Sequence, residues 1–409
     1  MRQFYTLSDF NFRDKRVLLR VDINCPLTKD TLRIFNDSRI RRIVPTVREL
    51  IGKQAKLVII AHQGRKGGWD YTSLEQHAER LSKNLNYPVK YVDDVLGDAA
   101  RKEIMELESS EVLMLGNVRE IDSESIEKGM EEQAESEIVN ALAPMFDYYV
   151  CDAFGAAHRS QSTLVGFEVK LPSASGRLMM KELFALSAIF DEPRRPSVFI
   201  LGGAKFGDIS YMIDHVLGTM TADTVILTGL AGNAFLYARG VNIGQASLDA
   251  LKYELTEDNL AMAKSVLDKY GQRILLPVDI AVERNGERVS VNIGDLPTEE
   301  PALDIGDVSA DKFRKVIESS KTSFMSGPAG MVEKEDFSIG THVLMKAMID
   351  SKGQSVIGGG HTGATAEKYN LSDSFAYTST GGGALESFLM GKPLPVVEAL
   401  KYSKAKFPK

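Results

Sequence analysis

The sequence predicts an α/β protein made of two doubly wound parallel-sheet (Rossmann-like) domains joined by a hinge helix. Short, continuously apolar β-rich runs alternate with amphipathic helical stretches along the whole chain. Such strands, without polar alternation, are typical of parallel sheets covered by helices on both faces. The pattern occurs once in each half, and a length of 409 residues favours two domains over one.

In the first half, five apolar runs are expected to be strands, and two longer stretches have helical spacing. The strands are Val17–Val21, Leu57–Ala61, Val89–Val92, Val112–Leu115 and Tyr148–Val150, and the helices are Ser73–Leu85 and Ile126–Ala143. In the second half the strands are Val198–Leu201, Val225–Thr228, Ile274–Pro277, Ser323–Met325, Val356–Ile357 and Ala376–Thr378, and the helices are Asn259–Tyr270, Asp311–Ser319 and Gly340–Ser351.

The break between the halves lies near residues 172–196. Pro172–Gly176 is small and polar, and Arg177–Phe190 has helical apolar spacing before Pro193 and Pro196. A single helix between two domains is a candidate hinge. The tail is short and basic, and either frays or packs back on the first domain. We therefore expect an N-terminal domain 1–172, a linker and interdomain helix 173–196, a C-terminal domain 197–392 and a tail 393–409.

Composition excludes several classes of function. The net charge of −7 argues against nucleic acid or an anionic membrane as a partner. Two cysteines and six histidines show no zinc spacing, and so few cysteines suit a reducing cytoplasm. No signal peptide or membrane span is apparent, so we expect a cytoplasmic protein.

Polar residues follow four strands of the first half. The segment D-Y-Y-V-C-D-A-F-G-A-A-H-R (147–159) ends in His158 and Arg159, and R-V-D-I-N-C-P-L (20–27), A-H-Q-G-R (61–65) and L-G-N-V-R (115–119) end other strands in the same way. Parallel strands share one ligand-binding edge, and arginines there are a common way to bind anions. The sequence thus indicates a small, highly charged ligand.

Five glycine-rich turns link strands to helices in the second half. They are L-G-G-A-K (201–205), T-G-L-A-G (228–232), M-S-G-P-A-G (325–330), I-G-G-G-H-T-G-A (357–364) and S-T-G-G-G-A (379–384). Glycines let the backbone approach a phosphate closely. No P-loop motif is present. Gly358, Gly360 and Gly363 match G-x-G-x-x-G, but the acidic residue that confirms a dinucleotide site is missing after the next strand.

Taken in order, these motifs resemble the phosphoglycerate kinase family. The series R-V-D-I-N-C-P-L, N-D-S-R-I (36–40), A-H-Q-G-R, G-N-V-R, D-A-F-G-A-A-H-R, G-G-A-K, S-G-P-A-G-M-V-E, I-G-G-G-H-T and S-T-G-G-G-A extends from Arg20 to beyond Gly391. The short loops and the G-G-G-H variant look like the archaeal branch. Each motif alone is moderate evidence, whereas the ordered set is highly specific.

The resemblance implies a glycolytic and gluconeogenic hinge-bending enzyme. It would transfer a phosphoryl group between 1,3-bisphosphoglycerate and ADP, giving 3-phosphoglycerate and Mg-ATP, as a monomer or homodimer. By resemblance, the substrate residues are Asp22, Asn24, Arg39, His62, Arg65, Arg119 and Arg159. The nucleotide residues are Gly202, Gly203, Ala204, Lys205, Gly229, Gly327, Pro328, Glu333, Gly359, Gly360, His361 and Thr362. The catalytic groups are Arg39, Lys205 and the backbone N–H groups of Gly381 and Gly382.

Two positions depart from the family pattern. His361 stands where an aspartate usually binds magnesium, and imidazole is a poor ligand for that ion. Either nucleotide phosphates hold the metal, or Asp208 helps; His361 itself either donates to a phosphate or merely starts a helix. Ile209 replaces a usual second lysine, which removes one positive charge and leaves more to Lys205 and Arg39.

Two other functions compete with the kinase. A nicotinamide-dependent dehydrogenase would use the glycine loop at Gly358, but it leaves the arginines unexplained. A non-catalytic anion- or nucleotide-binding relative would have lost activity through His361 and Ile209. Retention of Arg39, Lys205 and Glu333 argues against that loss, and measured transfer activity separates the two readings.

Overall fold

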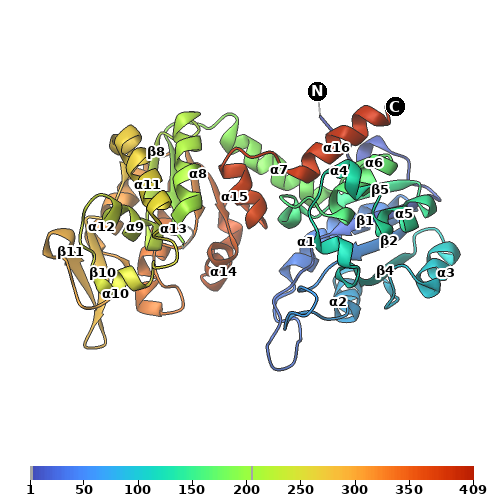
Figure 1. The fold of residues 1–409 in the computed structure, drawn as a ribbon, viewed down its shortest axis with the longest axis horizontal. Coiled ribbons are helices and arrows are strands. Elements are labelled where there is room, and N and C mark those ends of the chain that lie inside the picture. The colour runs from blue at the N-terminus through green and yellow to red at the C-terminus, as the bar shows by residue number, and fades with distance from the viewer. Residues whose placement is uncertain (1–2, 204–205) are drawn as a thin grey trace. The chain divides into compact units, whose positions relative to one another are not determined.

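The computed structural model describes residues 3–203 and 206–409 and confirms the predicted fold class (Figure 1). The chain forms two compact units, each built on a six-stranded parallel sheet. The first unit comprises the residues up to Leu183 together with Pro393–Lys409, and the second comprises Phe184–Lys392. The boundary therefore falls within helix α7, Arg177–Phe190.

The sheet of the first unit has the strand order β3-β4-β2-β1-β5-β6. The chain leaves the central strand β1 toward β2, β4 and β3, and later returns to its other side to form β5 and β6. The strands are β1 Arg16–Val21, β2 Lys56–Ala61, β3 Lys90–Tyr91, β4 Val112–Asn117, β5 Tyr148–Asp152 and β6 Ser173–Ser175. The helices are α1 Ser38–Gly52, α2 Glu75–Leu85, α3 Asp98–Glu106, α4 Met130–Gln133, α5 Glu137–Leu142, α6 Phe167–Lys170 and α16 Pro395–Lys406.

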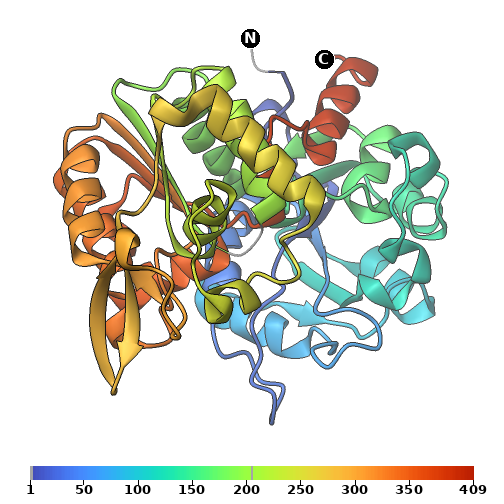
Figure 2. The same cartoon turned by 60° about the vertical axis from the view of Figure 1, so that its left-hand side comes forward.

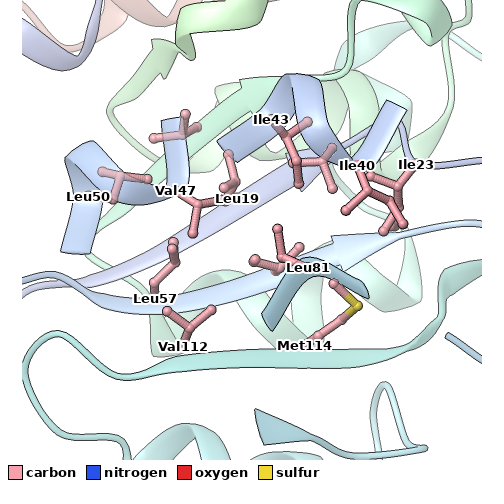
Figure 3. Packing of buried hydrophobic residues seen from close by; sticks show 14 of the residues in the cluster. Leu19, Ile23, Ile40, Ile43, Val47, Leu50, Leu57, Leu81, Val112 and Met114 are labelled. Carbon is pink, nitrogen blue, oxygen red and sulfur yellow. The ribbon is translucent and has the colours of Figure 1, made fainter. Parts of the chain in front are cut away.

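Helices α1 and α2 cover one face of this sheet (Figure 3). Ile40, Ile43, Val47 and Leu50 recur along α1 at helical spacing and are fully buried. They pack with side chains from the strands, including Leu19, Leu57, Val112 and Met114, and with Leu81 of α2. At about 1.5–3 kcal/mol for each fully buried large apolar side chain, this layer fixes the sheet on which the site is built.

The sheet of the second unit has the order β15-β14-β13-β7-β8-β9, and the chain again starts at a central strand and returns to its other side. The strands are β7 Ser197–Leu201, β8 Thr224–Leu227, β9 Ile274–Leu275, β13 Thr322–Ser326, β14 Gln354–Gly358 and β15 Tyr377–Thr378. The helices are α8 Phe206–Gly218, α9 Gly229–Ala238, α10 Gln245–Asp249, α11 Glu257–Tyr270, α12 Asp307–Glu318, α13 Ile339–Asp350, α14 Gly360–Lys368 and α15 Gly383–Leu389.

A small antiparallel sheet in the second unit was not predicted from the sequence. It consists of β10 Asp279–Arg284, β11 Glu287–Asn292 and β12 Asp304–Ile305, in the order β11-β10-β12. Figure 2 shows the hairpin of β10 and β11 projecting from its unit. Its turn is Asn285–Gly286, both with positive φ, which is the geometry that this dipeptide favours.

Two stretches of the first unit differ from the prediction. Ser173–Ser175 were expected to be linker but form edge strand β6, which pairs in parallel with Tyr149–Cys151 of β5. The three small residues are buried there, so the strand carries no apolar run that could reveal it. The helix expected over Ile126–Ala143 is instead the short helices α4 and α5.

The tail of the chain forms helix α16, which belongs to the first unit (Figure 1). Ser403 accepts a hydrogen bond from the backbone N–H of Ser173 (3.0 Å) and donates one to the carbonyl of Leu171 (3.1 Å). The backbone N–H of Val396 donates to the carbonyl of Ala157 (3.3 Å). These bonds tie the end of the chain to the loops around β5 and β6.

Candidate functional site

The predicted substrate residues of the first unit follow strands β1, β2, β4 and β5. Because all four strands are parallel, their carboxyl ends meet at one edge of the sheet. The order of the strands along the chain reverses between the neighbouring strands β1 and β5. Open α/β sheets bind their ligands at such a reversal point. The residues at this edge are Asp22 and Asn24 after β1, His62 and Arg65 after β2, Arg119 after β4 and Arg159 after β5.

Arg39, near the start of α1, forms an ion pair with Asp22. Burial by itself raises the pKa of the Asp22 carboxyl, but the surrounding cationic groups, Arg39 foremost, and a backbone hydrogen bond from Asn24 hold that pKa well below its usual range. Asp22 is therefore ionised at neutral pH and orients the Arg39 guanidinium. Gly155 keeps this space open, since a Cβ there would lie 2.2 Å from a carboxylate oxygen of Asp22.

His62 forms a hydrogen bond with a buried arginine. The guanidinium of Arg20, which has no exposed surface, donates to Nδ1 of His62 over 2.9 Å. Burial, reinforced by the charge of Arg20, lowers the pKa of His62 well below its ordinary value. His62 is therefore a neutral imidazole with its proton on Nε2, and the positive charge at this edge comes from arginines.

The remaining arginines repel one another. Burial and the charges of Arg159 and Arg20 lower the pKa of Arg119 to about 10. Burial also lowers the pKa of Arg159, and Arg65 adds to the effect while Asp22 opposes it. Cations held this close at a half-buried edge are relieved when an anion binds between them. The arrangement therefore favours a ligand with more than one negative charge.

In the second unit, three of the glycine-rich turns pack backbone against backbone. A Cβ on Gly202 would lie 2.3 Å from the carbonyl oxygen of Pro328, and one on Gly327 would lie 2.3 Å from the carbonyl carbon of Gly202. Gly229, with φ of +56°, lies against the same Pro328 carbonyl. Glycine is thus required at these strand ends by close packing, and the loops after β7, β8 and β13 form one continuous surface.

Two adjoining cavities open at this edge. The first has a volume of about 350 Å³ and is bounded by Leu230, Ala250, Leu303, Pro328 and Met331, with Glu333 at its rim. The second has a volume of about 260 Å³ and lies among the backbone turns of residues 202–203, 326–328 and 359–362, with Ile209 and Gly382. A largely apolar cavity beside one lined by glycine turns suits a flat base joined to phosphates.

Most of the predicted nucleotide residues in the described part of the chain line these two cavities. Thr362, fully buried in α14, accepts a hydrogen bond from the backbone N–H of Gly327 (2.8 Å), and His361 borders both cavities. The N–H of Gly381 donates to Ser379 Oγ (3.1 Å), so Gly382 rather than Gly381 faces the second cavity. Gly359 and Gly360 also line the second cavity. Ala204 and Lys205 lie outside the described residues.

Within residues 3–203 and 206–409, no three His, Cys, Asp or Glu side chains gather into a metal site. Asp208 lies in the first turn of α8 and is partly exposed. Magnesium in nucleotide sites commonly takes one or two carboxylates together with phosphates and water. The donor set of this unit fits an ion that arrives on a nucleotide.

Sequence reasoning missed Arg20 as a functional residue. Its position inside β1 predicts a sheet residue, yet it is fully buried and contacts His62 and Thr163. The available signal was a charged residue in the middle of an otherwise apolar strand, which is costly unless it is paired. His158 precedes Arg159 in the sequence, and its Nε2 accepts a hydrogen bond from the Arg159 guanidinium (3.4 Å).

Among the helices of the described residues, none is both long and apolar enough to cross a bilayer. The model of the family described as phosphoglycerate kinase matches residues 7–392. A phosphoglycerate kinase of Methanothermus fervidus is 43% identical over 98% of both chains. A crystal structure of phosphoglycerate kinase from Pyrococcus horikoshii has a TM-score of 0.92 at 39% identity, covering 98% of this chain and all of that one. For the enzyme from Coxiella burnetii the TM-score is 0.81 at 30% identity, with 98% and 99% covered.

Proposed function

The chain belongs to the phosphoglycerate kinase family, and from that premise we propose how its residues perform the reaction. It is a glycolytic phosphotransferase with a carboxyl group as acceptor, and it interconverts 1,3-bisphosphoglycerate plus ADP with 3-phosphoglycerate plus ATP. The observation that carries the assignment of sites is the separation of ligand chemistry between the units. One unit gathers mutually repelling arginines, and the other forms an apolar cavity beside glycine turns.

We assign 3-phosphoglycerate to the first unit. Arg65, Arg119 and Arg159 neutralise its phosphate and carboxylate, and the neutral His62 donates a hydrogen bond from Nε2. Asp22 and Asn24 contact the hydroxyl and carboxylate end. Arg39, oriented by Asp22, reaches the phosphoryl group in transfer. Guanidinium groups suit this task because they offer several donors in a fixed plane.

We assign the nucleotide to the second unit. The base enters the cavity of about 350 Å³, Glu333 at its rim binds the ribose hydroxyls, and the phosphates lie over the turns around Gly202, Gly327 and Gly359. His361, at the border of the two cavities, donates to a phosphate. Gly382 and the sequence-predicted Lys205 meet the transferred phosphoryl group. Gly203, Gly229, Pro328, Gly360 and Thr362 hold these turns in place.

Phosphoryl transfer needs positioning and charge stabilisation more than covalent help. The attacking carboxylate oxygen is already ionised, so no general base is required. Asp208 and the nucleotide phosphates would hold magnesium, which would supply neutralisation of the charge that develops during transfer. Direct transfer in a dry environment requires the two ligands to meet, and we propose that the hinge around α7 allows this. We further propose a cytoplasmic enzyme that acts as a monomer or homodimer.

The test is ATP-dependent turnover of 3-phosphoglycerate by the full chain, with and without magnesium. We expect turnover that requires the metal and that disappears when glycerol 3-phosphate, which lacks the acceptor carboxylate, replaces 3-phosphoglycerate. Folded protein that binds both ligands without turnover would contradict the proposed catalytic roles.

A further inference from the structure

The loops that carry the substrate residues of the first unit are tied together by one buried glutamine. Gln63 lies between His62 and Gly64, directly after β2, and its exposed fraction is 1%. Its side chain makes four hydrogen bonds, two to Cys25, one to His77 and one to Asp70 further along the same loop.

Two of these bonds join Gln63 to the loop after β1. The side-chain oxygen accepts from the backbone N–H of Cys25 (2.8 Å), and the side-chain NH₂ donates to the carbonyl of the same residue (3.1 Å). The paired bonds mimic one rung of a β-ladder and fix which way the amide faces. Cys25 directly follows Asn24, whose side-chain oxygen accepts from the N–H of Gly64 (3.0 Å). The loops after β1 and β2 are thus bonded at two successive positions next to Asn24 and His62.

The other two bonds join the Gln63 side chain to helix α2 and to a later part of its own loop. Its oxygen also accepts from Nε2 of His77 on α2 (3.0 Å), and its NH₂ also donates to the carbonyl of Asp70 (3.3 Å). His77 is fully buried, and burial lowers its pKa to about 4. Its imidazole is therefore neutral with the proton on Nε2, which matches the donor that the amide oxygen requires. Every donor and acceptor of the amide is used.

The backbone of Gln63 is bonded in the same reciprocal way to Asn117, the last residue of β4. Its carbonyl accepts from Nδ2 of Asn117 (2.7 Å), and its N–H donates to Oδ1 of Asn117 (3.4 Å). The same Oδ1 accepts from the backbone N–H of Arg119 (3.2 Å), and the Arg119 guanidinium donates to the carbonyl of Gly64. One residue therefore connects the ends of three strands.

We propose that Gln63 is a positioning residue for the 3-phosphoglycerate site, fixing the loops that carry Asn24, His62 and Arg119 relative to one another. This inference rests on the proposed function. The amide itself is buried beneath the loops and has no need to touch the ligand. Its contribution is preorganisation, because loops already held in the binding geometry lose less freedom when substrate binds.

The test compares Gln63→Leu, which keeps the size but removes all four side-chain bonds, with Gln76→Leu as a matched control. Gln76 also bonds to backbone on both sides, at Ile34 N–H (2.9 Å) and the Leu32 carbonyl (2.8 Å), but it joins no strand end. We expect Gln63→Leu to raise the KM for 3-phosphoglycerate about tenfold or more, with the KM for ATP changed less than twofold. Gln76→Leu should change neither KM more than twofold.

A purely structural role would lower the melting temperature of both variants without this split between the two KM values, and that result would overturn the proposal. If Gln63→Leu does not fold, His77→Leu removes only one of the four bonds. A rise of about threefold in the KM for 3-phosphoglycerate supports the proposal, and an unchanged KM in the folded variant overturns it. Absence of turnover in the wild type would instead refute the proposed function, so the two failures are distinguishable.

Discussion

The guanidinium of Arg20 donates to Nδ1 of His62 over 2.9 Å, and this contact determines the chemical form of the imidazole. A donor on Nδ1 leaves the ring proton on Nε2, while burial and the nearby charge keep the ring from taking a second proton. The histidine is therefore a neutral hydrogen-bond donor within an arginine site. Its role is directional, and the arginines supply the charge.

The neutral state of His62 can be observed directly. We expect NMR of the imidazole nitrogens, assigned with His62→Gln, to show the neutral Nε2–H form from pH 8 to below pH 6.5, because burial and the charge of Arg20 hold the pKa well below its ordinary value. His62→Gln keeps a neutral donor and should lose less affinity for 3-phosphoglycerate than His62→Ala. A titration midpoint near 6.5 would contradict this assignment.

Removal of one exposed substrate arginine should cost affinity without costing stability. Arg65 is exposed after β2 and lies close enough to Arg159 to lower its pKa. A charge-assisted hydrogen bond is worth about 1.5–3 kcal/mol, so Arg65→Ala should raise the KM for 3-phosphoglycerate about 10- to 100-fold. Its melting temperature without ligand should stay equal or rise, since repulsion is relieved. A clear fall in melting temperature would show that Arg65 has a structural role instead.

In the second unit, Thr362 should support nucleotide binding through the Gly327 turn. Thr362→Val removes the acceptor for the Gly327 N–H while keeping the side-chain volume. We expect the KM for ATP to rise about three- to tenfold, since a net hydrogen bond is worth about 1 kcal/mol, with the KM for 3-phosphoglycerate unchanged. The control is Thr365→Val on the same helix, whose hydroxyl donates within the helix to the His361 carbonyl (2.7 Å). Equal effects of both variants on the KM for ATP would refute the assignment.

A stability prediction concerns Glu168 in α6. It is fully buried, and neither carboxyl oxygen has a hydrogen-bond partner within the described part of the chain. Burial raises the pKa of Glu168 well above its ordinary value. A carboxyl whose pKa is raised by folding contributes most below its unfolded pKa, and that contribution is lost as pH rises toward the folded pKa.

Glu168→Leu should therefore stabilise the protein by about 1–3 kcal/mol, with a larger gain at pH 8 than at pH 5. Urea unfolding at both pH values measures the difference. Glu79→Leu replaces an exposed carboxylate on α2 and should change stability by less than about 0.5 kcal/mol, without a pH trend. Destabilisation of Glu168→Leu at pH 8 would show that the carboxylate has an undetected partner.

The sequence predicted the parallel strands well because their apolar runs are continuous and bounded by polar or glycine turns. The hairpin of β10 and β11 was missed although Asn285–Gly286 is a strong turn signal, since the apolar face of β11 consists of only Val289 and Val291 and contains no continuous apolar run. Strand β6 could not be found from Ser173–Ser175, because its burial depends on pairing with β5.

The sequence predicts the residues that line the candidate site, but it does not predict the hydrogen bonds that hold those residues in place. Residues such as Asp22, His62 and Arg119 follow strands directly, so the parallel topology alone brings them to one edge. The tautomer of His62 and the bonds of Gln63 depend on side-chain packing across loops distant in sequence. No periodic pattern encodes such contacts, and only the folded structure reveals them.

We propose that Arg39, held by Asp22, acts on the phosphoryl group in transfer, and a comparison of Arg39→Ala with Arg41→Ala tests this role. Arg41 lies two residues further along α1, is exposed, and pairs with Asp37 (3.0 Å). In the magnesium-dependent assay we predict that kcat falls about 10³-fold in Arg39→Ala, because arginines that stabilise the transferred phosphoryl group in other enzymes contribute at least this much. In Arg41→Ala we predict that kcat stays within twofold of the wild type. Circular dichroism establishes that both variants are folded. A folded Arg39→Ala variant with wild-type kcat would show that Arg39 does not act on the transferred phosphoryl group.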